Sequence, residues 1–325
     1  MRKLQQKRIL LLISSFLCAF FLYTWKKHLI PISRTDSFKS LAAPQYSIVD
    51  SQEQRKANIR SVCERNNLNG SSFVVPRNVA AQLYVEHSHK FIYCEVPKVG
   101  CSNWKRIILL LNKSLDLSAD ELQHFQVHNS KQLIKLSSYP PSLQKELLAT
   151  YTKVMFTRDP LERVVSAYRD KFLHYDNVYY SINFSNLIKN TLGIHSKANL
   201  TFEQFACFIV QENPSYRDTH WKPMNELCDP CKIQYDIIGK FETLAEDADL
   251  VLRTIGASQN LKYPTIKHHS NESRTSEDIS KHYLEMLPPV LFRKLMKIYG
   301  LDFSMFEYSY YKSEFFKIPK TTYIY

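Results

Sequence analysis

The stretch FIYCEVPKVGCSNWKRIILLL, residues 91–111, decides the fold. Its first part, 91–96, is a short aromatic and β-branched run, which predicts a strand. A loop at 97–102 follows, after which apolar residues recur at i, i+3, i+4 and i+7, a spacing typical of a helix. Those apolar positions are Trp104, Ile107, Ile108 and Leu111. The stretch therefore predicts a strand, a tight turn and a helix in succession.

The same unit recurs once further along the chain. Residues 152–157 (TKVMFT) predict a strand, and Asp-Pro at 159–160 opens a helix that runs to about residue 174, with proline at a tolerated first-turn position. A third strand is expected at 235–241 (YDIIGKF). Strands that alternate with helices indicate an α/β protein with a parallel sheet, which binds ligands at the carboxyl ends of its strands. Two capping boxes predict further helices, at 201–204 and at 243–246.

The first turn has the features of a phosphate site. Free N–H groups and the helix dipole at the start of a helix attract an anion. Gly100 lets the backbone approach a phosphate closely, and Lys98 can reach a bridging or leaving oxygen. The turn is not a Walker A loop, because the lysine precedes the glycine, and an ordinary basic turn is the alternative interpretation. The expected nucleotide-binding residues here are Pro97, Lys98, Val99, Gly100, Cys101, Ser102 and Asn103.

The second turn supplies a second group of anion-binding side chains. Arg158 leaves the end of a strand and Ser166 lies two turns into the following helix, so together they can hold a phosphate through charge-assisted hydrogen bonds. Glu162 and Arg163 are expected to form surface or packing ion pairs. Two anion sites on neighbouring strand ends suit a nucleotide phosphorylated at both its 5′ and 3′ positions. The binding segment is predicted to comprise Arg158, Asp159, Pro160, Leu161, Glu162, Arg163, Val164, Val165 and Ser166.

These two strings resemble a known family. YCEVPKVGCSNWKR (93–106) and FTRDPLERVVSAYRDKF (156–172) look like the 5′-phosphosulfate and 3′-phosphate motifs of the Golgi carbohydrate sulfotransferases, in the branch of the chondroitin, dermatan and terminal-GalNAc 4-O-sulfotransferases and the glucuronyl 3-O-sulfotransferase. The resemblance runs from about residue 83 to residue 308. Asp159 stands where several members have Glu, and the family varies at Val99 and Gly100. Three later strings agree with it: HWKPMNELCDPC, YDIIGKFETLAEDA and DFSMFEYS.

The resemblance implies a donor, a fold and a reaction. The donor is 3′-phosphoadenosine 5′-phosphosulfate, the fold is P-loop-like, and no metal is required. The acceptor hydroxyl attacks sulfur in line and adenosine 3′,5′-bisphosphate leaves. Because charge builds on the bridging oxygen, a cation held there stabilises the transition state more than the ground state. We expect Lys98 to be that cation.

The base that deprotonates the acceptor is expected to be a histidine. Related sulfotransferases use one beyond the first helix, where this chain has His124 and His128, spaced i, i+4 and so on one face if the segment is helical. His128 is favoured over His124, and surface or structural histidines are the alternative. His220, beside Trp221, is a weaker candidate for contact with the acceptor.

The amino-terminal region predicts a membrane anchor. The apolar run 9–25 spans about 26 Å as a helix, and six Lys and Arg residues flank it, four before and two after. A cleaved signal peptide is the alternative, although no small-x-small cleavage site follows. The expected organisation is a type II Golgi membrane protein with a cytoplasmic tail, an anchor, a lumenal stem and a lumenal catalytic domain. Their bounds are 1–8, 9–25, 26–60 and 61–325.

The charge balance and two residue types agree with a lumenal body. The formal net charge is +12, and about +6 remains once the six flanking basic residues are removed, which suits an anionic ligand but is too scattered for nucleic acid. Beyond the anchor there are six cysteines, which permits disulfides whose pairing the sequence does not give. Five Asn-x-Ser/Thr sequons predict glycosylation, at Asn69, Asn112, Asn183, Asn199 and Asn271.

Two further motifs are expected to be structural. Cys-Asp-Pro-Cys at 228–231 resembles a redox centre, but a strand is predicted after it, so a structural disulfide is favoured, either local or shared with another cysteine. Asp-Ala-Asp at 247–249 resembles a glycosyltransferase metal motif, but it lies within a predicted helix where i and i+2 point apart. Neither motif predicts a metal or redox site.

The sequence therefore predicts a carbohydrate sulfotransferase that acts on a glycan or glycosaminoglycan at the Golgi membrane. The resemblance favours O-4 of GalNAc in chondroitin, dermatan or glycoprotein glycans, with a glucuronyl 3-O-sulfotransferase as the alternative within the family. A nucleotide-sugar glycosyltransferase shares the topology and would need a divalent metal and a uridine site. A lumenal lectin or adhesion protein is the third hypothesis, and two phosphate turns would have no purpose there.

Overall fold

The structure is a computed structural model that describes residues 48–69, 74–111, 118–174, 178–196, 198–266 and 273–309. The predicted anchor, 9–25, lies outside these residues. Within the described part of the chain, no helix is long and apolar enough to cross a membrane. The described residues all belong to one compact unit.

A four-stranded mixed sheet lies at the centre of this unit, in the order β1-β2-β3-β4. β2, β3 and β4 are parallel, with Cys94 beside Met155 and Thr157 beside Lys240. These are the three strands that the sequence predicts, and they are confirmed. The expectation of a purely parallel sheet is wrong, because β1 pairs antiparallel with β2 through a tight hairpin. The strands are β1 (Leu83–Glu86), β2 (Phe91–Cys94), β3 (Thr152–Thr157) and β4 (Ile237–Lys240).

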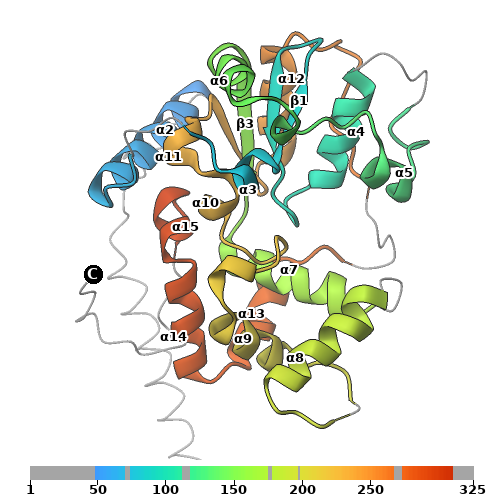
Figure 1. Ribbon diagram of the computed structural model, residues 1–325, viewed down its shortest axis with the longest axis vertical. Coiled ribbons are helices and arrows are strands. Elements are labelled where there is room, and N and C mark those ends of the chain that lie inside the picture. Colours follow the sequence, from blue (N-terminus) through green and yellow to red (C-terminus); the bar gives the residue numbers. More distant parts are fainter. Residues whose placement is uncertain are drawn as a thin grey trace, which may run out of the picture. The chain divides into compact units, whose positions relative to one another are not determined.

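Helices cover the sheet in the upper half of Figure 1. α4 follows β2 directly and packs Trp104 against Tyr93 and Phe156, with ring centroids 5.5 and 4.9 Å apart. Truncating such a core ring to alanine costs about 3–5 kcal/mol, so this contact fixes the helix over the strand that precedes it. The helices of this half are α2 (Ile48–Arg65), α3 (Arg77–Ala80), α4 (Cys101–Leu111), α5 (His124–Asn129), the 3₁₀ turn η1 (Leu136–Ser138), α6 (Pro141–Thr150), α10 (Met224–Cys228), α11 (Pro230–Ile233) and α12 (Leu244–Thr254).

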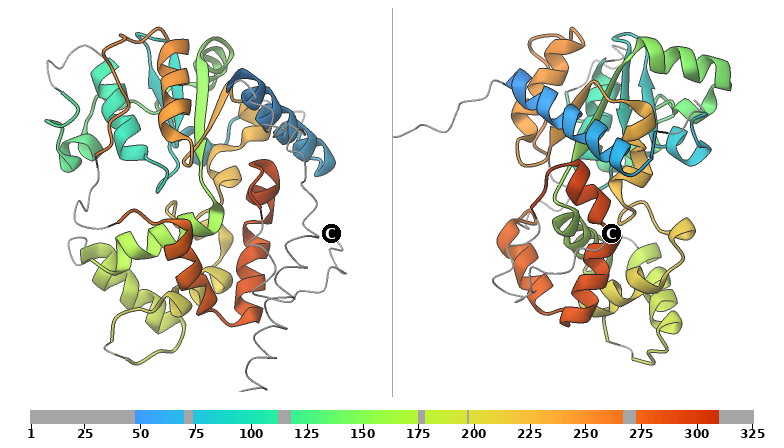
Figure 2. Two further views of the ribbon diagram at one scale, coloured as in Figure 1. Left: turned by 180° about the vertical axis from the view of Figure 1, so that it is seen from behind. Right: turned by 90° about the vertical axis from the view of Figure 1, so that its left-hand side faces the viewer.

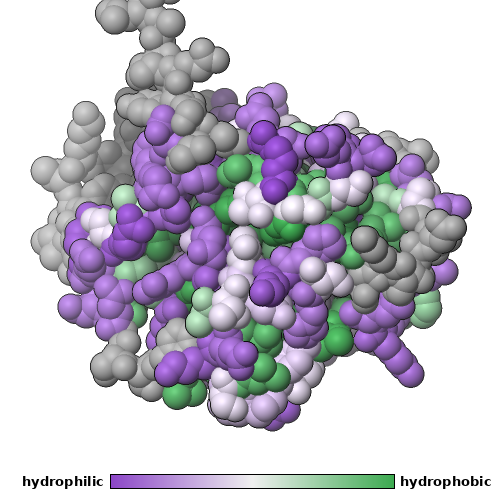
Figure 3. Space-filling model, turned by 90° about the horizontal axis from the view of Figure 1, so that it is seen from above, coloured by the Kyte–Doolittle hydropathy of each residue, from purple (hydrophilic) through white to green (hydrophobic). Residues whose placement is uncertain are grey.

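A second group of helices gathers below the sheet in the ribbon views (Figures 1 and 2). α7 leaves the end of β3 and packs its apolar face into a separate buried cluster that includes Phe205, Trp221 and Phe303. The elements of this half are α7 (Pro160–Phe172), the π-helix η2 (Tyr179–Phe184), α8 (Ser185–Thr191), α9 (Phe202–Gln211), the 3₁₀ turn η3 (Pro214–Tyr216), α13 (Glu277–Glu285), α14 (Pro289–Ile298) and α15 (Gly300–Met305). Seen from above, hydrophilic residues cover most of the molecule and hydrophobic ones appear in separate patches (Figure 3).

The two predicted capping boxes have different outcomes. At the start of α9, Thr201 and Gln204 each accept a hydrogen bond from the other's backbone N–H, so this box is confirmed. At the start of α12 the box is wrong: Thr243 caps no backbone N–H, and its hydroxyl donates to the Asp247 carboxylate instead. A carboxylate is a stronger hydrogen-bond acceptor than a neutral group, so the Thr243 hydroxyl donates to Asp247.

Helix α2 extends the compact unit into the segment that the sequence assigns to a stem. Residues 48–60 form most of this helix rather than an irregular spacer. Arg55 pairs with the buried Asp247 at 2.9 Å, and the Gln52 side chain both donates to and accepts from the backbone of Ile238. Asp247 is thereby used in holding α2 against β4 and α12, which agrees with the structural interpretation of Asp-Ala-Asp.

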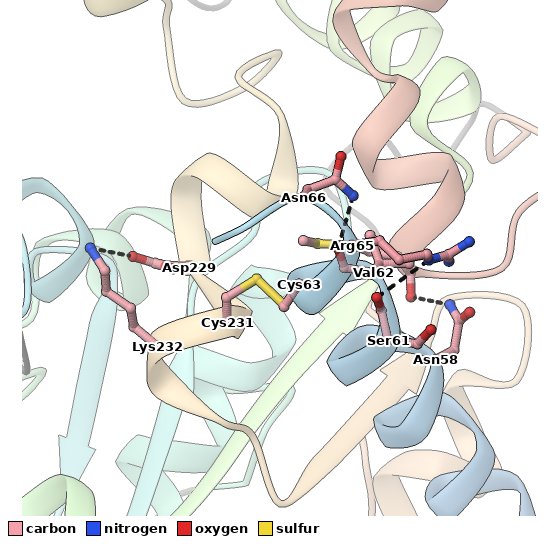
Figure 4. Close-up of a disulfide and its surroundings, with 10 residues drawn as sticks. Asn58, Ser61, Val62, Cys63, Arg65, Asn66, Asp229, Cys231 and Lys232 are labelled. Atoms are coloured by element: carbon pink, nitrogen blue, oxygen red, sulfur yellow. Dashed lines mark hydrogen bonds and ion pairs between the residues drawn. A yellow bond between two sulfur atoms is a disulfide. The ribbon is translucent and has the colours of Figure 1, made fainter. Parts of the chain in front are cut away.

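Two disulfides tie the Cys-Asp-Pro-Cys segment to distant parts of the chain. Cys231 bonds to Cys63 of α2, and Cys228 bonds to Cys94 at the end of β2. Figure 4 shows the first of these joining α2 to α11. The structural interpretation of these cysteines is confirmed, with both bonds shared rather than local. The remaining described cysteines, Cys101 and Cys207, are free thiols.

Candidate active site

A cavity of about 820 Å³ lies where the first and second turns meet. The two turns follow β2 and β3, which are adjacent and parallel, so their carboxyl ends meet at one edge of the sheet. The first turn contributes Pro97, Lys98, Gly100, Cys101, Ser102 and Asn103 to the wall, and the second contributes Arg158 and Ser166. Four histidines also line it: His124, His128, His174 and His220. The structure thus brings together the two anion-binding turns that the sequence placed side by side.

The first turn leaves backbone N–H groups available at the start of α4. Lys98 and Gly100 adopt positive φ angles of 71° and 77°, which turn the chain sharply into the helix. The amides of Gly100, Cys101 and Ser102 make no backbone hydrogen bond to any described residue, whereas the next amide, at Asn103, bonds back to Gly100. Three unpaired N–H groups at the start of an eleven-residue helix form a site suited to a phosphate.

Gly100 is required by a close neighbour. The Tyr263 hydroxyl donates to the Gly100 carbonyl at 2.9 Å, and a Cβ at residue 100 would lie 2.3 Å from that hydroxyl oxygen. The sequence assigned this glycine to close approach of a phosphate. The structure adds a second reason for it, contact with Tyr263.

Lys98 extends from the first turn to helix α7. Its Nζ lies 3.1 Å from Asp170 Oδ2, and the Nζ of Lys171 lies 3.0 Å from the same oxygen. Burial, with the nearby Lys171, lowers the pKa of Lys98 although Asp170 opposes the change. The two lysines hold the pKa of Asp170 well below its ordinary value despite its burial. Lys98 is therefore a partly buried cation that is paired with Asp170 and lies in the same turn as the amides of residues 100–102.

At the second turn the amides of residues 159 and 161–163 are all paired. Asp159 caps α7, and its Oδ1 accepts from the amides of Leu161 and Glu162 at 2.9 Å each. The next amide, Arg163 N, bonds to the Asp159 carbonyl, and Asp159 N donates to Glu242 Oε1. Any anion held at this turn must therefore be held by side chains.

Arg158 is the side chain at the second turn that can hold an anion. It is buried, donates to the Lys98 and Thr275 carbonyls and to Glu162, and lies over the Phe241 ring at 4.2 Å. Its Nε is buried and has no hydrogen-bond partner among the described residues. A buried N–H of a charged guanidinium is rarely left unpaired, so the Nε fits a ligand oxygen. Ser166 lines the same cavity.

Other residues predicted to bind nucleotide at this turn are core residues. Leu161, Val164 and Val165 are fully buried in the apolar cluster below the sheet, and Pro160 is buried as well. Glu162 forms the expected ion pair with Arg158. The four apolar residues therefore support the turn by packing, and Glu162 supports it through its ion pair with Arg158.

Arg163 links three segments of the site. It is 1% exposed, and it donates to the carbonyls of Pro97, Thr219 and Lys222 at 2.9, 2.7 and 2.7 Å. The sequence expected a surface or packing ion pair. Instead its guanidinium donates to backbone carbonyls, which holds the first turn, helix α7 and the segment 219–222 together.

The side chains of Asn103 and Ser102 already have hydrogen-bond partners within the protein. Both bonds of Asn103 Nδ2 go to the carbonyls of Pro264 and Ile266, and its Oδ1 accepts from Arg106. Ser102 Oγ lies 2.8 Å from His128 Nε2. Their predicted contact with nucleotide stays a prediction, and Asn103 would have to exchange existing bonds to make it.

The two predicted histidines do share a helix face. α5 runs from His124 to Asn129, and the rings of His124 and His128 lie 4.3 Å apart beside the cavity. Burial and the Lys105 charge lower the pKa of His128 to about 3. His128 is therefore neutral at neutral pH, although both of its ring nitrogens already have partners in Ser102 and Lys105.

Sequence analysis underestimated one residue of this cavity. His220 Nδ1 lies 2.7 Å from Asp218 Oδ1, and Tyr180 donates to Asp218 Oδ2 at 2.8 Å. An Asp two residues before a His is a weak local signal, and Tyr180 lies forty residues away in the chain, so sequence gave no reason to group the three.

The remaining predicted sites have mixed outcomes. Asn69, Asn183 and Asn199 are exposed, while Asn112 and Asn271 lie outside the described residues. Glycosylation of these sequons stays a prediction. Among the described residues no group of three or more His, Cys, Asp or Glu could hold a metal ion. That finding leaves the metal requirement untested.

The structure is an α/β protein in which two adjacent parallel strands lead into turns that line one cavity. The family model described as the sulfotransferase family matches residues 81–309, and the chain belongs to this family. The resemblance carried by the two turn motifs is therefore confirmed at the level of the family.

Relatives narrow the comparison to sulfotransferases of carbohydrates. Carbohydrate sulfotransferase 9 of Homo sapiens is 38% identical over 270 residues, 80% of this chain and 60% of the human protein. Carbohydrate sulfotransferase 8 of Mus musculus is 37% identical over 273 residues, 81% of this chain and 65% of the mouse protein. Carbohydrate sulfotransferase 11 of Rattus norvegicus is 32% identical over 269 residues, 79% of this chain and 76% of the rat protein.

The chain thus spans 60% and 65% of the length of the first two of these relatives. No solved structure matches it.

Proposed function

We propose that this chain is a carbohydrate sulfotransferase that transfers a sulfuryl group from 3′-phosphoadenosine 5′-phosphosulfate to a sugar hydroxyl. One observation carries the proposal: a single cavity is lined by Lys98, by residues 100–102 and by Arg158. Among the described residues, the amides of 100–102 have no backbone hydrogen-bond partner and the Arg158 Nε has no partner at all. This spacing of positive groups suits a nucleotide with phosphates at both its 5′ and 3′ positions. Membership of the sulfotransferase family supports the same assignment.

Each turn takes a distinct part in the proposed reaction. The amides of residues 100–102 hold the 5′-phosphosulfate end, and Arg158 with Ser166 holds the 3′-phosphate. Lys98 exchanges its contact with Asp170 for the bridging oxygen, where negative charge grows as the bond from sulfur to that oxygen breaks. His128, the base expected from sequence, borders the cavity beside Ser102.

For the acceptor, we propose a glycan or glycosaminoglycan with O-4 of GalNAc as the modified hydroxyl. Relatives named carbohydrate sulfotransferases 8, 9, 11 and 14 support a carbohydrate acceptor. The preference for O-4 of GalNAc rests on the motif resemblance alone. We also propose that the full protein is a single-pass type II protein of the Golgi membrane with this unit in the lumen, because the run 9–25 has the length and flanking charge of a signal anchor.

Calorimetry and a transfer assay test the function together. The purified protein is titrated with adenosine 3′,5′-bisphosphate, and it is then incubated with radiolabelled donor and chondroitin, desulfated dermatan, a terminal-GalNAc glycan or a glucuronyl glycan. We expect nucleotide binding and transfer to GalNAc acceptors, undiminished by EDTA. Absence of both binding and transfer would overturn the assignment, and transfer only to the glucuronyl glycan would overturn the acceptor proposal. Dependence on a divalent metal and a nucleotide sugar would favour a glycosyltransferase.

A further inference from the structure

His220 is held in a defined orientation at the wall of the cavity. Asp218 Oδ1 accepts from both the backbone N–H and the ring Nδ1 of His220, at 2.8 and 2.7 Å. The other oxygen of the same carboxylate accepts from the Tyr180 hydroxyl at 2.8 Å. Asp218 is therefore bonded on both oxygens, and the imidazole is fixed by two contacts to one partner.

These contacts decide which ring nitrogen carries the proton. A carboxylate accepts hydrogen bonds, so Nδ1 must be the N–H of a neutral ring and Nε2 must carry the lone pair. Among the described residues Nε2 has no hydrogen-bond partner, and the imidazole is 22% exposed where it lines the cavity. The ring thus presents an unoccupied proton acceptor to the space where an acceptor hydroxyl would enter.

His128 has the opposite arrangement. Lys105 can only donate, and its Nζ lies 3.2 Å from His128 Nδ1, so Nδ1 of the neutral ring holds the lone pair. The proton is then on Nε2, which donates to Ser102 Oγ at 2.8 Å. Both nitrogens are occupied, and Lys105 is itself fixed by Glu95 at 2.5 Å. His128 would have to lose its contact with Lys105 before its Nδ1 could accept a proton from a substrate.

The segment that carries His220 is fastened to the turn that carries Lys98. Arg163 donates to the carbonyls of Thr219 and Lys222 on either side of His220 and to Pro97, the residue before Lys98. One buried guanidinium therefore sets the position of the histidine relative to the lysine. Such pre-organisation of two groups across a reacting centre lowers the entropic cost of reaching the transition state.

We propose that His220, and not His128, is the general base of the transfer, with Asp218 and Arg163 as its positioning residues. The inference rests on the proposed function. Nε2 takes the proton of the acceptor hydroxyl as its oxygen forms the new bond to sulfur. The bond from sulfur to the bridging oxygen breaks, and its electron pair leaves with adenosine 3′,5′-bisphosphate beside Lys98. The imidazolium then gives its proton to water when the products leave.

The charges around His220 suit this role at neutral pH. Asp218 on its own segment and Tyr180 on η2 face the ring, and Lys171 on α7 and Lys98 on the first turn, paired through Asp170, lie near it. Burial lowers the pKa of His220, Lys171 and Lys98 lower it further, and Asp218 partly opposes them. The ring is therefore neutral, as a base must be, down to a pH below the ordinary value of a histidine.

Three substitutions compare the histidines directly. His220→Gln, His128→Gln and the control His195→Gln, an exposed residue outside the cavity, are assayed for kcat, pH–rate profile and calorimetric affinity for adenosine 3′,5′-bisphosphate. We expect H220Q to lose on the order of 10²–10³-fold in kcat with nucleotide affinity within about twofold, because the base acts on the acceptor and not on the donor. Its profile should lose the fall in rate at acid pH, and H128Q should retain that fall.

Two further experiments distinguish a base from a structural residue. They are chemical rescue of histidine variants and substitution of Asp218. Added imidazole should restore part of the rate of His220→Ala and none of the rate of His128→Ala. Asp218→Asn should lower kcat and move the acid limb to lower pH, since it removes the charge that opposes the lowering of the His220 pKa. Wild-type kcat in H220Q, or rescue of H128A alone, would overturn the inference. A wild-type protein that neither binds nucleotide nor transfers sulfate would overturn the proposed function, and the inference with it.

Discussion

The two strand-to-helix turns occupy equivalent places in the sheet but are built in opposite ways. In the turn after β2 the amides of residues 100–102 make no backbone hydrogen bond to a described residue. In the turn after β3 the amides of residues 159 and 161–163 bond to Glu242, to the Asp159 side chain and to the Asp159 carbonyl. The first can bind an anion through its backbone, and the second only through Arg158 and Ser166. The difference teaches that similar motifs in sequence need not bind by the same groups.

The difference between the two turns also fits different tasks for them in the proposed reaction. A backbone site with a movable lysine suits the end of the donor where bonds break, because Lys98 can leave Asp170 for a developing charge. A rigid capped turn with a buried arginine suits the end that only needs to be held. Each turn can therefore be disabled by a different kind of substitution, with a different readout.

The largest effect is expected at the first turn. Lys98→Ala should lower kcat by on the order of 10²–10³-fold, about 3–4 kcal/mol of transition-state stabilisation. Affinity for adenosine 3′,5′-bisphosphate should fall by a much smaller factor, since the amides remain. Steady-state transfer assays and calorimetry measure the two effects, with Lys145→Ala, exposed on α6, as the control. Near-normal turnover of K98A would remove this lysine from the mechanism.

A smaller, more selective effect is expected at the second turn. Arg158→Ala should weaken binding of adenosine 3′,5′-bisphosphate by roughly 10–100-fold, as expected for one charge-assisted contact, and binding of adenosine 5′-phosphate far less. Ser166→Ala should follow the same pattern with a loss nearer 1 kcal/mol. Equal losses for both nucleotides would mean that this turn does not recognise a 3′-phosphate. Thermal unfolding is measured alongside, because Arg158 also donates to the Lys98 and Thr275 carbonyls.

The smallest effect concerns the cap that closes the second turn. Burial and the nearby Glu162 and Glu242 raise the pKa of Asp159 to about 7, although the amides it caps oppose the change. Between its ordinary value and about 7 the folded chain holds a proton that the unfolded chain has lost. The contribution of this proton to stability is complete at low pH and is lost as the pH rises through 7.

Asp159→Asn keeps the Oδ1 acceptor without the titration, so wild-type stability should fall relative to D159N by roughly 1–3 kcal/mol between pH 5 and pH 8. Asp159→Ala should cost about 0.5–2 kcal/mol through the lost cap. Denaturant unfolding at the two pH values measures both. A difference between wild type and D159N that does not change with pH would contradict the raised pKa.

The sequence predicted the strands and turns of this site better than the hydrogen bonds between its side chains. Strands β2, β3 and β4 are buried runs of apolar residues, which can be recognised without knowledge of the fold. β1 was missed because its four residues lead directly into the polar hairpin at 87–90. The two turns were found because each has a short strand before it and a periodic helix after it.

Long-range contacts explain most of what sequence could not give. Nothing near Asn103 indicates that its amide is taken by carbonyls at 264 and 266, and nothing near Arg163 indicates carbonyl partners in two other segments. The choice between His128 and His220 depends on which ring nitrogens are already bonded, and that is a property of packing. Residue type and spacing can therefore nominate a catalytic residue, but its hydrogen-bond partners decide whether it can act.

The pairing of Cys94 with Cys228 and of Cys63 with Cys231 bears on how the protein can be prepared. The bonds join residues 134 and 168 positions apart, and closing loops of such length can stabilise a chain by about 4–5 kcal/mol each in the chain-entropy model. One of them anchors the strand that leads into Lys98. Protein expressed in a reducing cytosol would lack both crosslinks, so secretion through an oxidising compartment is the sounder route to material whose nucleotide site is intact.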